Sequence, residues 1–142
     1  MAYKDKSDEH IKAWASRIFR HIAEKNRKKY NIYQNDFDSK YIKELYNNQN
    51  KKCYWFDIEI TPSKIPRHPF KPSIDRLDNN KGYTKDNIVL CSLMANFARN
   101  SLQEEEWIDV VKKFKKELLQ KYMDESFREN YYTNKFDIDF YM

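Results

Sequence analysis

Glycine and cysteine are scarce in this chain. Gly82 is the only glycine among 142 residues, and Cys53 and Cys91 are the only cysteines. A glycine used once is expected to serve its backbone, and Gly82 ends the turn cluster 79–82. Two thiols are half of a tetrahedral zinc site, so a structural zinc is not expected, and nothing in the sequence indicates the secretion that favours disulfides. We therefore expect both cysteines to be small buried side chains.

Long apolar runs are missing as well. No stretch is long enough to span a membrane, and the N-terminus, MAYKDKSDEH, lacks the apolar region of a signal peptide. These absences favour an intracellular protein in the cytoplasm, with no membrane partner. The length and the 40% hydrophobic content predict a single domain over residues 1–142 with a modest core.

Acids, amides and the single glycine are concentrated in residues 72–100, PSIDRLDNNKGYTKDNIVLCSLMANFARN. The proline bias makes residues 72–75 extended, and residues 87–90 form a second short strand after the turn. Leu90, Leu93, Met94 and Phe97 then recur at helical spacing, which predicts a helix that runs to Arg99. The segment is therefore expected to fold as a hairpin followed by a helix.

This arrangement brings two oxygen-bearing side chains together. Asp75 ends the first strand and Asn96 lies on the helix, so the two can face each other across a cleft. A carboxylate and an amide oxygen are hard ligands, which suit Mg²⁺, Mn²⁺ or a similar ion that takes its remaining ligands from water and substrate phosphates. We predict a single divalent ion held by these two residues.

The same residues resemble the HNH endonucleases of the ββα-metal class, of the type found in phages, large viruses and mobile elements. Asp75 matches the family's Asp, Asn87 its middle Asn, and Asn96 its terminal metal-binding position nine residues later. Arg99 falls where the family often carries a basic residue near the scissile phosphate. Segments on both sides add support between about residues 15 and 107: Tyr41–Leu45, Gln49, Cys53–Trp55 and Leu102–Trp107.

The resemblance implies an α+β fold, mostly helical, with a central ββα motif at about 72–100. It implies a metal-dependent endonuclease that hydrolyses phosphodiester bonds in DNA by nicking or cleavage, with Asn87 orienting the base or bracing the hairpin. A binding module that has kept the fold and lost the chemistry is the alternative. The residues expected to contact nucleic acid are Arg76, Lys81, Arg99, Arg17, Arg20 and Lys28.

The general base is the main departure from the family pattern. The residue after Asp75 is normally histidine, but here it is Arg76, which stays protonated and cannot accept a proton. Three interpretations follow. Asp78 serves as base, as the histidine in this place does in a related subgroup; His68 swings in from the preceding proline-rich loop; or the protein binds without cutting, or cuts slowly by metal-activated water alone. Retained catalysis is favoured because the metal pair is intact.

Ordinary structural roles compete with each functional one. Asp and Asn commonly satisfy backbone groups in turns, which would account for Asp75, Asp78, Asn79, Asn80 and Asn87 taken singly. Arg76 would by itself be interpreted as an ion-pair partner of Asp78. Asn96 resists this explanation because it interrupts an apolar helix face, where an amide must find a partner.

Positive charge supports a polyanionic partner. The net charge is +5 and the pI is near 9.0, and lysines and arginines gather in residues 17–29 and again in residues 64–85. One such cluster is usually a solvated surface, but two beside a candidate phosphate-cleaving site predict DNA as partner, with RNA left open. Binding of this kind is largely independent of sequence and weakens steeply with salt.

Three further helices are expected around the motif. An apolar stripe from Ile11 to Ile22 predicts a basic helix over about 8–28, with His10 and His21 on its surface and without chemistry. A second helix covers about 39–48, capped by Asp38 or Ser39. Ser101 and Glu104 form a capping box for a helix to about residue 122. The tail, residues 123–142, stays undecided between a strand, a packed segment and a partner-binding segment.

Overall fold

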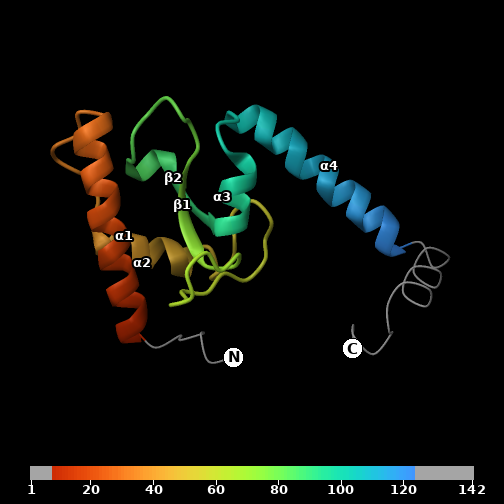
Figure 1. Ribbon diagram of the computed structural model, residues 1–142, viewed down its shortest axis with the longest axis horizontal. Helices are drawn as coiled ribbons and strands as arrows, with labels where there is room; N and C mark the ends of the chain where they lie inside the picture. The colour runs from red at the N-terminus through yellow and green to blue at the C-terminus, as the bar shows by residue number, and fades with distance from the viewer. Residues whose placement is uncertain (1–7, 124–142) are drawn as a thin grey trace. The chain divides into compact units, whose positions relative to one another are not determined.

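The computed structural model describes residues 8–123 as an α+β fold (Figure 1). This part of the chain contains four α-helices and one antiparallel sheet of two strands. The order is α1 (Asp8–Lys29), α2 (Ser39–Asn48), β1 (Pro72–Arg76), the short 3-10 helix η1 (Lys85–Asn87), β2 (Ile88–Ser92), α3 (Leu93–Arg99) and α4 (Glu104–Met123). No described helix is long and apolar enough to cross a bilayer. The expected tail lies outside the described residues.

Two compact units divide the chain. The first ends at Glu104 and contains every element from α1 to α3, and the second begins at Glu105 and contains most of α4. All the residues of the candidate site lie in the first unit.

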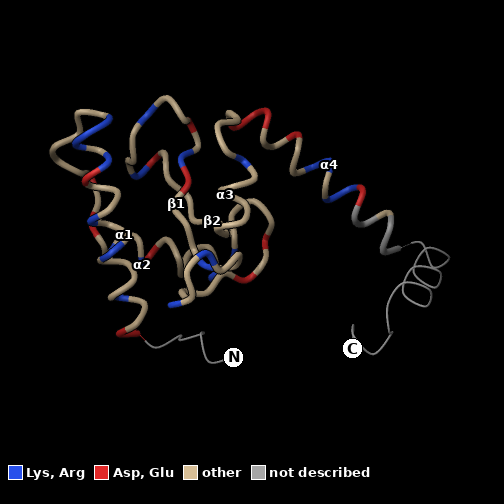
Figure 2. Tube along the Cα trace, viewed as in Figure 1, with Lys and Arg blue, Asp and Glu red and all other residues tan. Residues whose placement is uncertain are grey.

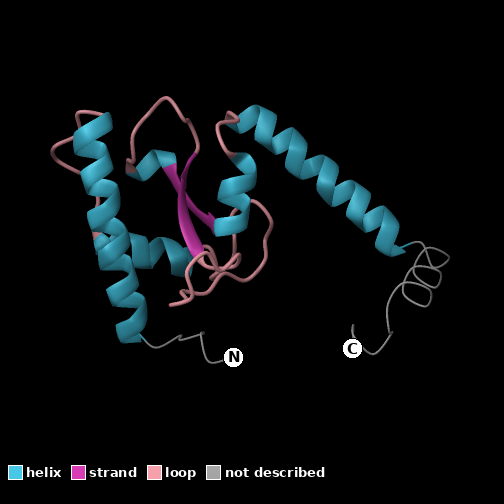
Figure 3. Cartoon of the chain, viewed as in Figure 1, coloured by secondary structure: helices cyan, strands magenta, loops and turns pink. Residues whose placement is uncertain are grey.

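The hairpin and α3 occur in the expected order along the chain. Figure 3 shows the two strands in magenta among the helices. The strands pair antiparallel, with Asp75 opposite Val89 and Pro72 opposite Ser92. Two boundaries differ from the prediction. Asn87 ends η1 rather than starting the second strand, and β2 continues to Ser92, so the helix begins at Leu93 rather than near Leu90. Ser92 explains this start, because its Oγ accepts a hydrogen bond from the backbone N–H of Ala95 at 3.1 Å.

The face of α3 that lies in the protein is not the expected apolar one. Met94 is 46% exposed and Phe97 is 67% exposed, whereas Ala95 and Arg99 are fully buried. The small Ala95 side chain lets the helix approach the sheet closely, and Arg99 reaches an acidic partner beneath it, described below. Helical spacing identified the helix but assigned the wrong side of it to the core.

The first two helices agree with their predicted bounds. In α1, Ile11, Trp14, Ala15 and Ile22 are buried, as the apolar stripe indicated. Asp38 caps α2, since its Oδ1 accepts hydrogen bonds from the first backbone N–H groups of that helix.

The last helix begins at Glu104, two residues later than a helix capped by Ser101 would begin. The backbone of Leu102, in the segment before the helix, forms hydrogen bonds with other parts of the protein. The carbonyl of Leu102 accepts hydrogen bonds from Arg99 Nε at 3.0 Å and from Asn79 Nδ2 at 2.8 Å, and its N–H donates to the carbonyl of Arg99. These bonds hold the connection against the hairpin loop and delay the helix.

Cys53 and Cys91 are both buried free thiols, so their predicted burial is confirmed. Burial raises the pKa of the Cys91 thiol, and the neighbouring charge of Asp75 and the Cys53 thiol act in the same direction. Cys91 therefore behaves as a small apolar side chain at neutral pH.

Asn26 joins α1 to the loop between the two strands. Its side chain is fully buried, and its amide pairs with the backbone of Tyr83 in both directions: Oδ1 accepts from the N–H and Nδ2 donates to the carbonyl, each at 2.8 Å. Nδ2 also donates to Asn35 Oδ1 at 2.8 Å. This Asn26–Tyr83 joint connects residues 57 positions apart and fixes α1 beside the hairpin.

Gly82 allows the close approach at this joint. A Cβ atom at Gly82 would lie 2.6 Å from Ile32 Cδ1, 2.9 Å from Asn26 Oδ1 and 3.0 Å from Tyr30 Cβ. The single glycine is thus needed for the steric room that it leaves rather than for a positive φ.

Gly82→Ala should lower the free energy of unfolding by about 1–3 kcal/mol through overpacking, as measured by urea denaturation. Lys81→Ala, at the exposed neighbour, is the control, and an equal loss there would contradict the explanation.

Tyr46 makes stability sensitive to alkali. Its hydroxyl donates to the carbonyl of Ile60 at 2.8 Å, and burial, with help from the charge of Glu59, raises its pKa from 10.0 to about 12. Above pH 10 the unfolded chain loses this proton before the folded one, so the stability present below pH 10 is lost as the pH rises toward 12. Tyr46→Phe should be less stable at pH 7 by about 1 kcal/mol but should show a flatter decline between pH 10 and 12 in denaturant titrations. An unchanged slope would contradict this.

Candidate functional site

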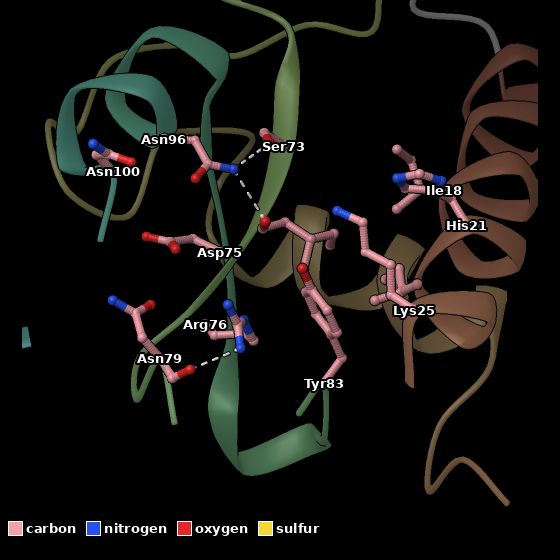
Figure 4. Close-up of a pocket in the computed structure, with 12 residues that line it drawn as sticks. Ile18, His21, Lys25, Ser73, Asp75, Arg76, Asn79, Tyr83, Asn96 and Asn100 are labelled. Atoms are coloured by element: carbon pink, nitrogen blue, oxygen red, sulfur yellow. Dashed lines mark hydrogen bonds between the residues drawn. The ribbon is translucent and has the colours of Figure 1, made fainter. Parts of the chain in front are cut away.

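A pocket of about 230 Å³ lies between α1 and the hairpin (Figure 4). One wall consists of α1 residues, and the other is formed by the hairpin, its loop and α3. The α1 wall contains Ile18, His21, Ile22 and Lys25. The opposite wall contains Ser73, Ile74, Asp75, Arg76, Asn79, Tyr83, Asn96 and Asn100. Asp75 and Asn96, predicted as partners from sequence, therefore share one pocket.

Asp75 is held by its Oδ2 atom. That oxygen accepts hydrogen bonds from Trp55 Nε1 at 2.9 Å and from Arg99 Nη1 at 2.8 Å, and the residue is only 6% exposed. The Arg99 contact is also an ion pair between two buried side chains. Oδ1 of Asp75 accepts no hydrogen bond from the described residues. One carboxylate oxygen is thus fixed and the other is left for a ligand.

Asn96 is oriented by its nitrogen. Nδ2 donates to Ser73 Oγ at 2.6 Å and to the carbonyl of Ile74 at 3.2 Å. These two acceptors fix which end of the amide is nitrogen, and they leave Oδ1 on the side of Asp75, as Figure 4 shows. Within the described chain this oxygen has no donor. Asn96 accordingly finds the partners that a part-buried amide needs while keeping its acceptor atom available.

The donor set fits a hard divalent cation. Two protein oxygens of this kind suit an ion that keeps several waters and takes further ligands from phosphate. The described residues contain no group of three or more His, Cys, Asp or Glu side chains that could hold a metal by themselves. Asp75 Oδ1 and Asn96 Oδ1 can therefore supply part of a coordination shell, which a substrate would complete.

Arg76 lies in the pocket between two tyrosines. Its guanidinium carbon is 4.9 Å from the ring centre of Tyr30 and 5.3 Å from that of Tyr83. Nη1 donates to the Tyr30 hydroxyl and to the carbonyls of Asn79 and Lys81, the latter two at 2.9 Å. The ion pair with Asp78 considered from sequence is not formed. The Tyr83 hydroxyl also hydrogen-bonds to this guanidinium. No carboxylate among the described residues forms an ion pair with Arg76, so its positive charge is available to an anion in the pocket.

Arg99 occupies a different place from the one expected. It is fully buried, and its guanidinium donates to Asp75, to the carbonyl of Arg76 at 2.5 Å and to that of Leu77 at 2.7 Å. A phosphate contact by Arg99 would require these bonds to break inside the protein. Its role here is to bind the turn after β1 and to hold Asp75 in position.

Asn87 braces the hairpin loop. Its Oδ1 accepts from the N–H of Asp78 at 2.8 Å, and its Nδ2 donates to the carbonyls of Asp78 at 3.1 Å and Gly82 at 2.9 Å. The carboxylate of Asp78 accepts from the N–H of Asn80 at 2.9 Å, a local turn contact, and Asp78 does not line the pocket. The brace expected of Asn87 is present, whereas the candidate base Asp78 lies outside.

The remaining candidates also lie away from the pocket. His68 uses Nδ1 to accept from the N–H of Phe70 at 3.2 Å, and its ring packs beside the Phe70 ring. Lys81 is exposed in the hairpin loop. Arg17, Arg20 and Lys28 are exposed on α1, where Lys28 forms an ion pair with Glu24 at 2.6 Å. Figure 2 shows the positions of lysine and arginine residues spread along α1.

Two pocket residues escaped the sequence analysis, His21 and Lys25. They lie four residues apart on α1, next to the buried positions Ile22 and Asn26. Their position beside the buried stripe of α1 was the only sequence signal that they lie near a site. The sequence did not indicate which part of the protein this side of α1 would pack against. Burial lowers the pKa of Lys25, and the positive charges of Lys29 and Arg76 lower it further. The pocket is thus a place where cations crowd together.

Comparisons with protein-family models, with curated proteins and with solved structures gave no match to this chain. The function is therefore argued from the pocket itself.

Proposed function

We propose that this protein is a divalent-metal-dependent endonuclease that hydrolyses phosphodiester bonds in DNA, and that the pocket between α1 and the hairpin is its active site. One observation carries the proposal: two oxygens without donors, Asp75 Oδ1 and Asn96 Oδ1, share a pocket with the cations Arg76 and Lys25. Oxygen ligands beside unpaired positive charge suit a metal ion together with a phosphate.

Each residue has a distinct part in this proposal. Asp75 and Asn96 hold one Mg²⁺ or Mn²⁺ ion, which when bound supplies positive charge to the scissile phosphate and the leaving oxygen. Arg76, fixed between its two tyrosine rings, and Lys25 bind the non-bridging phosphate oxygens. Arg99 keeps the Asp75 carboxylate in one orientation from beneath. Arg17 and Arg20 extend the contact along the DNA backbone.

The test uses Asn96→Ala. Removing one metal ligand should slow plasmid nicking or linearisation in Mg²⁺ or Mn²⁺ by about 100-fold, the scale of losing one electrostatic contact to the transition state. Binding of Mn²⁺, followed by electron paramagnetic resonance, should weaken in the same variant. Thermal melting checks that the variant folds.

Asn48→Ala is the matched control, because Asn48 is exposed at the end of α2. It should cleave like the wild type, and EDTA should abolish cleavage by both. A wild-type protein that yields no metal-dependent product would overturn the proposed activity. Equal cleavage by Asn96→Ala and wild type would remove Asn96 from the site.

A binding module without cleavage is the second candidate. The position of Arg76 favours a binding module, because Arg76 lies where the HNH endonucleases that the sequence resembles have their general base. In addition, Nη1 of Arg76 already forms hydrogen bonds within the protein. Such a protein would bind DNA with an affinity that falls with salt, with a logarithmic slope of about −0.9 per phosphate contacted. Salt-sensitive binding without any metal-dependent product would select this alternative.

A further inference from the structure

The pocket contains one side chain able to accept a proton whose role is still open, His21. Arg76 cannot accept a proton, and Asp78 and His68 lie outside the pocket. Of the three histidines in the sequence, all within the described residues, only His21 lines it. Its imidazole comes from α1, across the pocket from the hairpin; Figure 4 shows it on the α1 side, while the Asp75 carboxylate points away from α1.

The position of His21 relative to the hairpin is fixed by packing. Ile22, the next residue, is 2% exposed, and Asn26, little more than one turn further along α1, is fully buried and hydrogen-bonded to the backbone of Tyr83. The imidazole itself is exposed. His21 is therefore held by a well-anchored helix and is accessible to water. A general base needs both properties.

We propose that His21 is the general base of the reaction, a role that rests on the proposed nuclease function. An unprotonated ring nitrogen of His21 accepts a proton from a water molecule as the water oxygen forms a bond to phosphorus. The bond between phosphorus and one ester oxygen breaks, and that oxygen takes a proton from solvent. The imidazolium then returns its proton to solvent, which leaves a phosphomonoester and an alcohol.

The charged and titratable groups around His21 are known. Glu24 and Lys25 lie on the same helix, and the charge of Glu24 interacts with His21. Asp75, Arg76 and Tyr83 line the pocket from the hairpin and its loop. Asp75 is neutralised by its buried ion pair with Arg99. No hydrogen bond or ion pair joins His21 to these described groups. His21 and the two oxygens that would hold the metal thus come from opposite walls of the pocket. Lys25 and Arg76, the cations proposed to bind phosphate, line the same pocket.

The experiment compares His21→Ala with Glu9→Gln and Asp78→Asn in single-turnover cleavage of plasmid DNA. His21→Ala should be slower by at least about 100-fold, with unchanged DNA affinity measured in EDTA and an unchanged melting temperature. The acid limb of the pH–rate profile should disappear in this variant, and added imidazole should restore part of the rate. Glu9→Gln removes a charge from the exposed first turn of the same helix, outside the pocket, and should cleave normally.

The outcomes separate the two proposals. If the wild type cuts and His21→Ala cuts within about threefold of it, the inference falls and the nuclease stands. An acid limb that persists in His21→Ala but vanishes in Asp78→Asn would assign the base to Asp78 and overturn the inference. A wild type without metal-dependent product would remove the proposed function, and the base with it.

Discussion

Asp75→Ala is expected to lower the free energy of unfolding by about 3–5 kcal/mol, apart from any effect on cleavage. Arg99 is fully buried, and its ion pair with Asp75 balances its charge. Removing the carboxylate leaves a buried, uncompensated guanidinium, which costs far more than a lost surface contact. Arg99→Met should be destabilising for the reciprocal reason.

A double-mutant cycle measures this effect. Asp75→Ala combined with Arg99→Met removes both charges, so its loss of stability in urea denaturation should be clearly smaller than the two single losses added together. Simple additivity would show that the pair contributes nothing beyond its separate packing.

The ion pair between Asp75 and Arg99 makes Asp75 a poor residue to substitute in cleavage assays. An inactive Asp75→Ala protein would be expected from unfolding as well as from loss of a metal ligand. Asn96 is the better residue to substitute, because its partners Ser73 and Ile74 are uncharged and it is only part-buried.

Asn87→Ala is expected to cost about 3 kcal/mol, at about 1 kcal/mol for each of three hydrogen bonds. The side chain is buried, and the alanine variant leaves the N–H of Asp78 and the carbonyls of Asp78 and Gly82 without their partner. Asn80→Ala is the matched control, since Asn80 is exposed in the same loop and only its backbone is hydrogen-bonded. Thermal and urea denaturation measure the stability of both variants. Equal losses of stability in Asn87→Ala and Asn80→Ala would show that the Asn87 side chain does not brace the loop.

Local patterns predicted most of the elements correctly. The stripe from Ile11 to Ile22 and the cap at Asp38 give α1 and α2, because burial and capping are properties of a few neighbouring residues. The boundaries of β2 and α4 were missed where a distant partner decides. Leu102, for example, has its carbonyl bound by Asn79 from the hairpin loop, and no local signal reports that contact.

The site was predictable on one side only. The nine-residue spacing of Asn87 and Asn96 and the strand before them identify the hairpin wall, since all of it lies within one short segment. The α1 wall is nearly fifty residues away in sequence, and its approach depends on Asn26 and Gly82. Arg99 shows the same limit: a basic residue near the motif looks like a phosphate contact until its burial beside Asp75 is known.

The Asn26–Tyr83 joint also fixes when the pocket can exist during synthesis of the chain. α1 leaves the ribosome first, and the residue that anchors it to the hairpin follows 57 positions later. At about 5–20 residues per second, α1 waits roughly 3–11 s for its partner to be made. No nascent chain shorter than the hairpin loop can hold His21 opposite Asp75, so each molecule acquires the pocket only after most of the first compact unit has been translated.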